Sequence, residues 1–230
     1  MRDARARRAE RRIVVEGPHL LAAALDAGLK PVAVFGTEAG LARPDIQRLA
    51  KQPIVVSASV FNSIADAETP VGVAAELALP EMQREGSAVL LEGIQDAGNL
   101  GAIIRSAAAF GAGAVVVDRQ CADPWSAKVL RAGQGGHFAL AIRQVDDLSA
   151  AVTDHRLICT VVAGGRPLRE ANLSGRIAWA FGTEGAGLSD RMLARAAERV
   201  TIPMAGSESL NVAAAAAICF YEAFCRERGF

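Results

Sequence analysis

Arg105 is a cation on an otherwise apolar helix that is expected within LEGIQDAGNLGAIIRSAAAFG, residues 91–111. A strand ends there, a polar turn follows, and Asn99 stands where the N-cap of the helix is expected. Burying a guanidinium alone is expensive, so it must reach an anion, a carbonyl or water. Two interpretations stay open. Arg105 extends into solvent or caps a carbonyl, or its fork of donors binds a phosphate.

Glu184 is a single carboxylate among glycines in WAFGTEGAGL, residues 179–188, directly after an apolar strand. Glycines allow the backbone to approach a ligand closely or to take a positive φ. The spacing of Gly182, Gly185 and Gly187 is not G-x-G-x-x-G, and no Walker lysine is present. A cradle for nucleotide phosphates is therefore poorly supported.

Small polar residues open the last helical segment, in IPMAGSESLNV, residues 202–212. Ser207, Ser209 and Asn211 stand at a helix start, where backbone N–H groups are free. Capping explains one of them but not the whole pattern. The run Ala213–Ala217 indicates close packing against the core or a partner subunit.

Arginines are concentrated in the first twelve residues, although the chain has no net charge. The cluster comprises Arg2, Arg5, Arg7, Arg8, Arg11 and Arg12. It either binds phosphates or forms a frayed, solvated terminal helix.

Composition is that of an ordinary globular protein. No run approaches the roughly 18 apolar residues of a membrane span, and no signal-peptide core is present, so we expect a cytoplasmic protein. The cysteines (Cys121, Cys159, Cys219, Cys225) show no metal-ligand spacing with the histidines, and we expect reduced, mostly buried thiols and no metal.

Strands and helices alternate along the whole chain. In the first part, strands are expected at Ile13–Glu16, Val32–Phe35, Ile54–Ser57 and Val71–Leu77, and helices at Pro18–Ala27, Asp45–Lys51 and Ser59–Asp66. The polar segment Leu79–Gly86 breaks this pattern. We therefore predict an N-terminal domain at 1–79, a linker at 80–86 and a second domain at 87–230.

The second part predicts an α/β fold with a parallel sheet covered on both faces. Its strands are expected at Ala88–Leu91, Ala114–Val117, Leu140–Ile142, Leu157–Val162, Ile177–Phe181 and Val200–Ile202, before a long helix from Leu210 to Arg228. Ligands in such sheets bind beyond the carboxyl ends of the strands, where the polar and glycine-rich segments lie.

Together the three segments resemble the motifs of the SpoU–TrmH branch of the SPOUT methyltransferases, in order and at suitable spacing. They are Asn99-Leu100-Gly101 with Arg105, the run Gly182–Gly187, and Ile202-Pro203-Met204 with Ser209-Leu210-Asn211-Val212. The resemblance extends from about Gly86 to Arg228. The first part is similar, more loosely, to the ribosomal-protein-L30e-like RNA-binding domain that precedes this fold in many relatives.

The resemblance implies a fold and an assembly that periodicity alone does not give. The C-terminal chain would form a deep trefoil knot, whereas knots are absent from most folds. The protein would act as a homodimer with its cofactor sites near the subunit interface. Phe220, Tyr221 and Phe224 on the last helix suit such an interface or a core.

By the same resemblance the reaction is transfer of a methyl group from S-adenosylmethionine to a ribose 2′-hydroxyl. Carried over by position, the cofactor-binding residues are Thr160, Val161, Val162, Ala163, Phe181, Gly182, Thr183, Glu184, Gly185, Ile202, Pro203, Met204, Ser209, Leu210, Asn211 and Ala213.

The implied catalytic residues are Arg105, Asn99, Glu184, Asn211 and Ser209. Arg105 would fix a phosphate beside the 2′-oxygen and stabilise its developing charge, because an arginine is an unlikely base. Asn99 would orient Arg105 or the substrate, and Glu184 would hold the cofactor loops or the dimer contact. The RNA-binding candidates are Arg8, Arg11, Arg12, Arg105, Lys128 and Arg131.

The sequence departs from the family between the first two motifs. Lys128 and Arg131 are present, but Gly133–His137 replaces a segment in which relatives often carry a serine and an alanine. His137 either contacts RNA or is structural.

Four functions remain to be separated. Ribosomal RNA is the preferred substrate and transfer RNA the alternative. A catalytically silent RNA-binding protein is opposed by the four intact residues Asn99, Arg105, Glu184 and Asn211. A dinucleotide-dependent oxidoreductase, suggested by Asp118 after a strand, lacks the glycine fingerprint.

Overall fold

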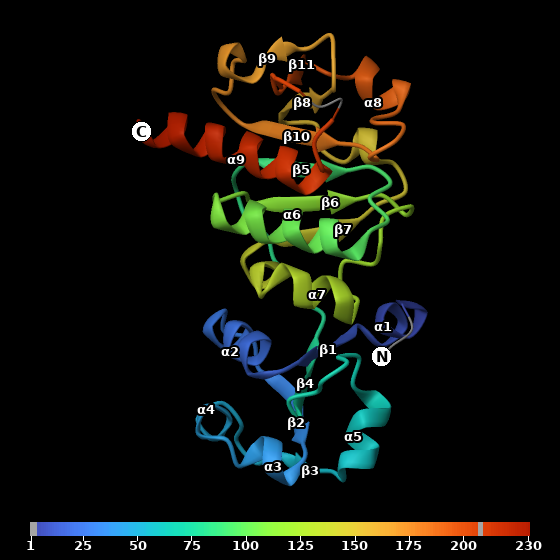
Figure 1. Ribbon diagram of the computed structural model, residues 1–230, viewed down its shortest axis with the longest axis vertical. Helices are drawn as coiled ribbons and strands as arrows, with labels where there is room; N and C mark the ends of the chain where they lie inside the picture. Colours follow the sequence, from blue (N-terminus) through green and yellow to red (C-terminus); the bar gives the residue numbers. More distant parts are fainter. Residues whose placement is uncertain (1–3, 207–208) are drawn as a thin grey trace.

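The chain forms two sheets, one above the other along the long axis of the molecule (Figure 1). The computed structural model describes residues 4–206 and 209–230, so Arg2 and Ser207 lie outside the described residues. The smaller sheet has four strands in the order β1-β4-β2-β3, and the larger has seven in the order β7-β6-β5-β10-β8-β11-β9.

The smaller sheet is mixed, because β1 and β2 pair antiparallel with β4 while β3 runs parallel to β2. Its strands are β1 (Arg12–Glu16), β2 (Pro31–Gly36), β3 (Ile54–Val55) and β4 (Val73–Ala78). The surrounding helices are α1 (Ala4–Glu10), α2 (Pro18–Asp26), α3 (Glu38–Leu41), α4 (Pro44–Gln47) and α5 (Ala58–Ile64). Ile13 and Val15 alternate inward along β1 and are fully buried, so one face of the sheet forms the core.

The larger sheet is parallel throughout. Its strands are β5 (Ala88–Leu91), β6 (Ala114–Val117), β7 (Ala141–Gln144), β8 (Arg156–Thr160), β9 (Arg166–Pro167), β10 (Ile177–Phe181) and β11 (Glu198–Thr201). Every residue of β5 and β10 is buried, as expected for central strands with helices on both faces.

Helices and short 3₁₀ turns connect these strands. They are α6 (Ala97–Ala109), α7 (Ala127–Gly133), η1 (Gly136–Ala139), η2 (Leu148–Ala150), η3 (Leu168–Glu170), α8 (Asp190–Ala194) and α9 (Val212–Arg228). The helices α6 and α9 lie side by side on one face of the sheet (Figure 1).

Gly101 permits α6 and α7 to cross closely. A Cβ at this position would lie 2.4 Å from the Cβ of Ala132 and 2.8 Å from the carbonyl oxygen of Val129. A side chain here would push α7 away, and α7 carries the residues that contact the smaller sheet.

The two parts of the chain share a hydrophobic cluster. Leu130 and Phe138, from α7 and η1, pack in the same buried group as Leu21 and Leu77 of the smaller sheet and its helices. The predicted limits 1–79, 80–86 and 87–230 remain a prediction, although β4 ends at Ala78 and β5 begins at Ala88.

Several predicted element ends shift. The strand expected at Ile54–Ser57 has only two residues, the helix expected at Asp45–Lys51 ends at Gln47, and the last helix begins at Val212 instead of Leu210. The start of α2 is as expected, with Pro18 in its first turn, and Gly28 just beyond its end has a φ of 80°.

Candidate active site

The three segments singled out in the sequence meet at the carboxyl edge of the larger sheet. Because the strands are parallel, the loops after β5, β10 and β11 leave the same edge. The loop after β5 leads into α6, the loop after β10 forms a tight turn, and the segment after β11 leads into α9. Each brings one polar side chain to a common point.

Asn99, Glu184 and Asn211 form a closed hydrogen-bonded triangle at that point. The Nδ2 atom of Asn211 donates to Glu184 Oε1 (2.8 Å) and to Asn99 Oδ1 (2.9 Å), and Asn99 Nδ2 donates to Glu184 Oε1 (3.0 Å). The Oδ1 atom of Asn211 accepts from the backbone N–H of Ala213 and Ala214, which caps α9. The cap fixes which side of the amide faces Glu184, so the helix start orients the whole triangle.

The cap of α6 is Asp96, and the prediction that Asn99 caps this helix is wrong. The Asp96 carboxylate accepts from the backbone N–H of Asn99 at 2.7 Å. The negative charge of an aspartate at this position also interacts favourably with the positive end of the helix dipole. The side chain of Asn99 is therefore available for the triangle.

The glycines around Glu184 build a tight turn. Thr183 and Gly187 exchange backbone hydrogen bonds of 3.1 and 3.0 Å, and Gly187 has a φ of 71°. A Cβ on Gly182 would lie 2.1 Å from the carbonyl carbon of Gly187. Only glycine allows this approach, and the turn carries Glu184 to the triangle.

A cavity of about 310 Å³ lies beside the triangle and is lined by loops from β8, β10 and β11. The predicted cofactor residues that line it are Thr160, Val161, Val162, Phe181, Gly182, Thr183, Glu184, Gly185, Ile202, Met204, Ser209 and Leu210. The predicted residues outside its lining are Ala163, Pro203, Asn211 and Ala213.

The cavity also has lining residues that were not among the residues predicted to bind the cofactor. They are Ala186, Gly187, Leu188, Leu193, Val200, Val212 and Ala215. Ala186, Gly187 and Val212 belong to the motifs identified in the sequence. The others are ordinary apolar residues, and nothing in their type or spacing distinguished them from core residues.

Arg105 is exposed on α6 and has no hydrogen-bond or ion-pair partner among residues 4–206 and 209–230. It stands six residues after Asn99, which on a regular helix is about 9 Å along the axis and about 120° around it. The hydrogen bonds of the Asn99 side chain go to Glu184 and Asn211, and none goes to Arg105. Arg105 is therefore an available cation on the helix that begins at the triangle.

The basic residues predicted to bind RNA differ in their surroundings. Arg11 pairs with Glu81, Arg12 lies 4.0 Å from Glu76, and Arg131 donates to Asp66 at 2.9 Å. Arg8 and Lys128 are exposed and form no ion pair within the described part of the chain. Three of the five cations outside α6 are thus already engaged by carboxylates.

His137 is structural. It is fully buried, and its Nε2 donates to the carbonyl oxygen of Pro124 at 2.8 Å. Gly133 packs on its ring, since a Cβ there would lie 2.3 Å from Cε1. Burial lowers the pKa of His137 to about 4, so the ring is neutral at pH 7. The glycine-rich departure from the family motif therefore makes room for this ring.

Three of the four cysteines are not poised as nucleophiles. Cys121, Cys159 and Cys219 are buried, and burial raises the pKa of these thiols to about 12, 11 and 12 respectively. Within residues 4–206 and 209–230, no group of three or more His, Cys, Asp or Glu side chains could hold a metal ion. In that same part of the chain no helix is long and apolar enough to cross a membrane.

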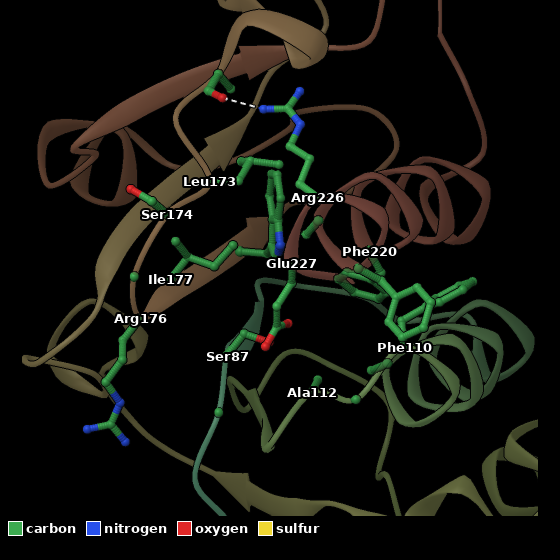
Figure 2. Close-up of a pocket in the computed structure, with 18 of the residues that line it drawn as sticks. Ser87, Phe110, Ala112, Leu173, Ser174, Arg176, Ile177, Phe220, Arg226 and Glu227 are labelled. Atoms are coloured by element: carbon green, nitrogen blue, oxygen red, sulfur yellow. Dashed lines mark hydrogen bonds between the residues drawn. The ribbon is translucent and has the colours of Figure 1, made fainter. Parts of the chain in front are cut away.

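A larger cavity, of about 690 Å³, lies at the opposite edge of the sheet, between α9 and the starts of β5 and β10 (Figure 2). Phe110, Phe220 and Ile177 line it, and Arg226 beside it donates to the carbonyl oxygen of Ala171 at 2.6 Å. None of the predicted site residues lines this cavity.

Comparison with known proteins agrees with this geometry. Residues 86–221 match the model of the SpoU rRNA Methylase family, and residues 1–75 match that of the MRM3-like substrate binding domain. The chain is 33% identical over 218 residues to the 23S rRNA (guanosine(2553)-2'-O)-methyltransferase RlmP of Bacillus subtilis, covering 90% of this chain and 86% of RlmP.

Solved structures are similar as well. The SpoU methyltransferase AviRb from Streptomyces viridochromogenes, in complex with AdoMet, has a TM-score of 0.86 and 26% identity over 98% of this chain and 94% of its own. A structure described as giving insights into 2-OH methylation of C/U34 on tRNA has a TM-score of 0.57 and 30% identity, over 62% of this chain and 97% of its own.

The parallel sheet, the cavity at its carboxyl edge and the N-terminal substrate-binding part define an α/β protein of the SPOUT type. Within that class, the chain belongs to the SpoU methylase family.

Proposed function

We propose that this protein transfers the methyl group of S-adenosylmethionine to a ribose 2′-hydroxyl of RNA, with ribosomal RNA as its substrate. The observation that carries the proposal is the Asn99–Glu184–Asn211 triangle, which joins all three motifs beside one apolar cavity. RlmP, whose name gives 23S rRNA as its substrate, matches 90% of this chain. The structure concerned with tRNA matches only 62%. This difference favours ribosomal RNA and leaves transfer RNA as the second candidate.

The cavity fits S-adenosylmethionine. Val162 and Leu210 are 60% and 36% exposed at its walls, and apolar side chains left open in this way can enclose an adenine ring. The segments that would hold the cofactor are Thr160–Ala163, Phe181–Gly185, Ile202–Met204 and Ser209–Ala213. When bound, the cofactor supplies a methyl group on a positively charged sulfur.

Arg105 would act on the RNA and not on the cofactor. The ribose 2′-oxygen becomes a good nucleophile only as its proton is lost, and a guanidinium stays charged at any accessible pH. Arg105 would hold a phosphate beside that oxygen and stabilise its developing negative charge. The proton would leave to a phosphate oxygen or to water.

The triangle would position the reacting groups. Glu184 accepts from both asparagines, so it ties the turn after β10 to the starts of α6 and α9. Through this connection Asn99 and Asn211 would set the place of the cofactor loops relative to Arg105. Ser209 lines the cavity and would complete the pocket.

RNA contacts would extend from Arg105 to the exposed cations. Lys128 and Arg8 are the favoured phosphate contacts because they carry no ion pair within the described residues. Arg11, Arg12 and Arg131 would first have to leave their carboxylate partners.

A homodimer is part of the proposal. On α9, Tyr221 and Ile218 are 57% and 39% exposed, and Tyr221 packs edge-on against Phe110, just beyond the end of α6, with 5.7 Å between ring centroids. An exposed aromatic and aliphatic face on this helix suits a second copy of this chain. The N-terminal domain, at 1–79, would deliver RNA to this assembly, and the enzyme would work in the cytoplasm, where its RNA is found.

The test uses purified protein, S-adenosylmethionine with a labelled methyl group, and total RNA from cells that lack the gene. We expect label in one ribosomal RNA, in dinucleotides that resist alkali, because a 2′-O-methyl group blocks cleavage there. Label in transfer RNA would instead identify transfer RNA as the substrate. Cofactor binding without label in any RNA, assembly intermediates included, would establish the catalytically silent alternative.

A further inference from the structure

A cleft of about 540 Å³ lies between the two parts of the chain and has no role in the proposed chemistry. Its residues from the smaller part include Val14, Glu16, Phe35 and Ile64, and those from the larger part include Trp125 and Lys128. The volume falls within the range of about 300–1,000 Å³ that small-ligand sites occupy.

Trp125 is an aromatic wall that the fold holds in place. Its ring packs against the buried ring of His137 with 5.4 Å between centroids. His137 in turn holds the carbonyl oxygen of Pro124, the residue before Trp125, and the backbone N–H of Trp125 donates to Asp123 at 2.9 Å. A ring fixed in this way offers stacking surface at little cost in conformational entropy.

Two ion pairs bridge the parts of the chain on either side of the cleft. Arg7 of α1 donates through Nε to Asp123 at 3.1 Å, and this pair is largely buried. Arg131 of α7 donates to Asp66, beyond the end of α5, at 2.9 Å. The cleft is therefore a preformed feature of the fold.

The Trp125 wall of the cleft follows a strand at the same edge of the sheet as the candidate active site. Trp125 lies in the loop that follows β6, and β6 runs parallel to β5, whose loop leads to Asn99. Lys128 stands at the rim of the cleft, on the helix α7, which packs against α6. A strand of RNA lying along this edge would pass both places.

The polar groups of the cleft suit a base and not a phosphate. Glu16 accepts through Oε2 from the backbone N–H of Asp66 at 3.0 Å, and its buried Oε1 has no donor among the described residues. A carboxylate oxygen without a donor costs free energy, and the N–H groups on the edge of a base can supply one. The exposed ammonium of Lys128 would meet the phosphate outside.

We propose that this cleft binds one unstacked base of the substrate RNA near the methylated nucleotide, with the base against Trp125 and its phosphate at Lys128. This inference rests on the proposed function, since it assigns the site to the same RNA. By holding this base, the cleft would fix the position of the RNA and so determine which nucleotide reaches Arg105.

Tryptophan fluorescence tests the proposal independently of methyl transfer. The probe is a single-stranded oligoribonucleotide of mixed sequence, added to the full-length protein saturated with S-adenosylhomocysteine. The other tryptophan, Trp179, is buried in the core and serves as a constant background. We expect RNA to quench the emission of the wild-type protein and to leave that of Trp125→Phe unchanged.

Affinity for the same RNA provides the second readout. Trp125→Ala should weaken binding about 10-fold, since removal of a stacking side chain costs about 1–3 kcal/mol. Because Trp125→Ala could also disturb folding, Ile64→Ala and Val60→Ala form a matched pair. Both side chains are on α5 and similarly exposed (44% and 50%), but only Ile64 lines the cleft. Ile64→Ala should weaken binding several-fold and Val60→Ala should not.

The results separate the two proposals. If the protein methylates RNA while its Trp125 emission is insensitive to that RNA and Ile64→Ala equals Val60→Ala, the cleft does not bind a base. If RNA quenches Trp125 and no RNA is methylated, the cleft binds an RNA base and the proposed reaction is wrong.

Discussion

At the scale of single residues, Arg105 and the Asn99–Glu184–Asn211 triangle have different roles in the site. The triangle satisfies its own hydrogen bonds, whereas Arg105 has no partner within the described part of the chain. Arg105 therefore contributes no hydrogen bond or ion pair to the stability of the described part of the fold. Its removal should therefore affect the reaction more than the stability.

Arg105→Ala should lower kcat for methyl transfer by about 100-fold or more, as loss of a charge-stabilising donor does in other enzymes. Cofactor affinity, measured by calorimetry, should stay within a few-fold because Arg105 does not line the cavity. Arg143→Ala removes another exposed arginine, on β7, and should leave kcat unchanged. Equal turnover in the two variants would remove Arg105 from the mechanism.

His137 makes stability depend on pH in a defined window. Its pKa is about 4 in the folded chain, whereas the ordinary value is 6.5, so the unfolded chain binds more protons between these values. The stabilisation is present above pH 6.5 and is lost as the pH falls toward 4. From this residue, the free energy of unfolding should be about 2 kcal/mol lower at pH 5 than at pH 7.

Urea unfolding at the two pH values measures this difference. His137→Gln keeps an N–H donor for Pro124 but has no titrating ring, so its loss of stability between pH 7 and pH 5 should be smaller by that amount. The same loss in both proteins would show that His137 does not have a lowered pKa.

At the scale of elements, the close crossing of α6 and α7 connects the site to the N-terminal part. Gly101 makes the crossing possible, and α7 carries Lys128 and Arg131 at the cleft. Gly101→Ala should destabilise the protein by about 1–3 kcal/mol in chemical unfolding, because overpacking forces helices apart. Gly206→Ala, with open space around its Cβ, should change stability little. Equal effects would mean that the crossing tolerates a methyl group.

Sequence periodicity located most strands of the larger sheet because they are short apolar runs between polar loops. Residue type alone misplaced the cap of α6, because Asp96 and Asn99 are both good capping residues and lie three positions apart. The structure shows that Asp96 is the cap. Periodicity could not show that Asn99 and Asn211 meet Glu184, because these contacts join residues 85 and 27 positions apart. The motifs identified these three residues as candidates, and the parallel strands explain why their side chains meet at one edge of the sheet.

At the scale of the whole molecule, the arrangement of the two parts was beyond the sequence. Arg7 and Arg131 are arginines like any other in the sequence, yet they form the ion pairs that bridge the parts. The polar and glycine-rich segments predicted the cavity edge, but Leu193 and Val200 carry no signal that separates a cavity wall from a core. The trefoil knot stays a prediction from the family resemblance.

The proposed dimer makes a prediction at this scale. In sedimentation velocity the protein should have twice the chain mass of 24.0 kDa. Tyr221→Glu places a charge in the exposed face of α9 and should yield monomers, whereas Val32→Glu, at another exposed apolar position, should leave the dimer intact. A wild-type monomer, or a Tyr221→Glu dimer, would contradict the proposed interface.

The most direct measurement for the central claim is mass spectrometry of nucleosides from ribosomal RNA of two strains, one lacking the gene and one complemented with it. We expect a single 2′-O-methylated nucleoside to be absent from the first strain and restored in the second, and we expect the Arg105→Ala gene not to restore it. Identical ribose methylation in the two strains, with a methylated base as the only difference, would contradict the central claim.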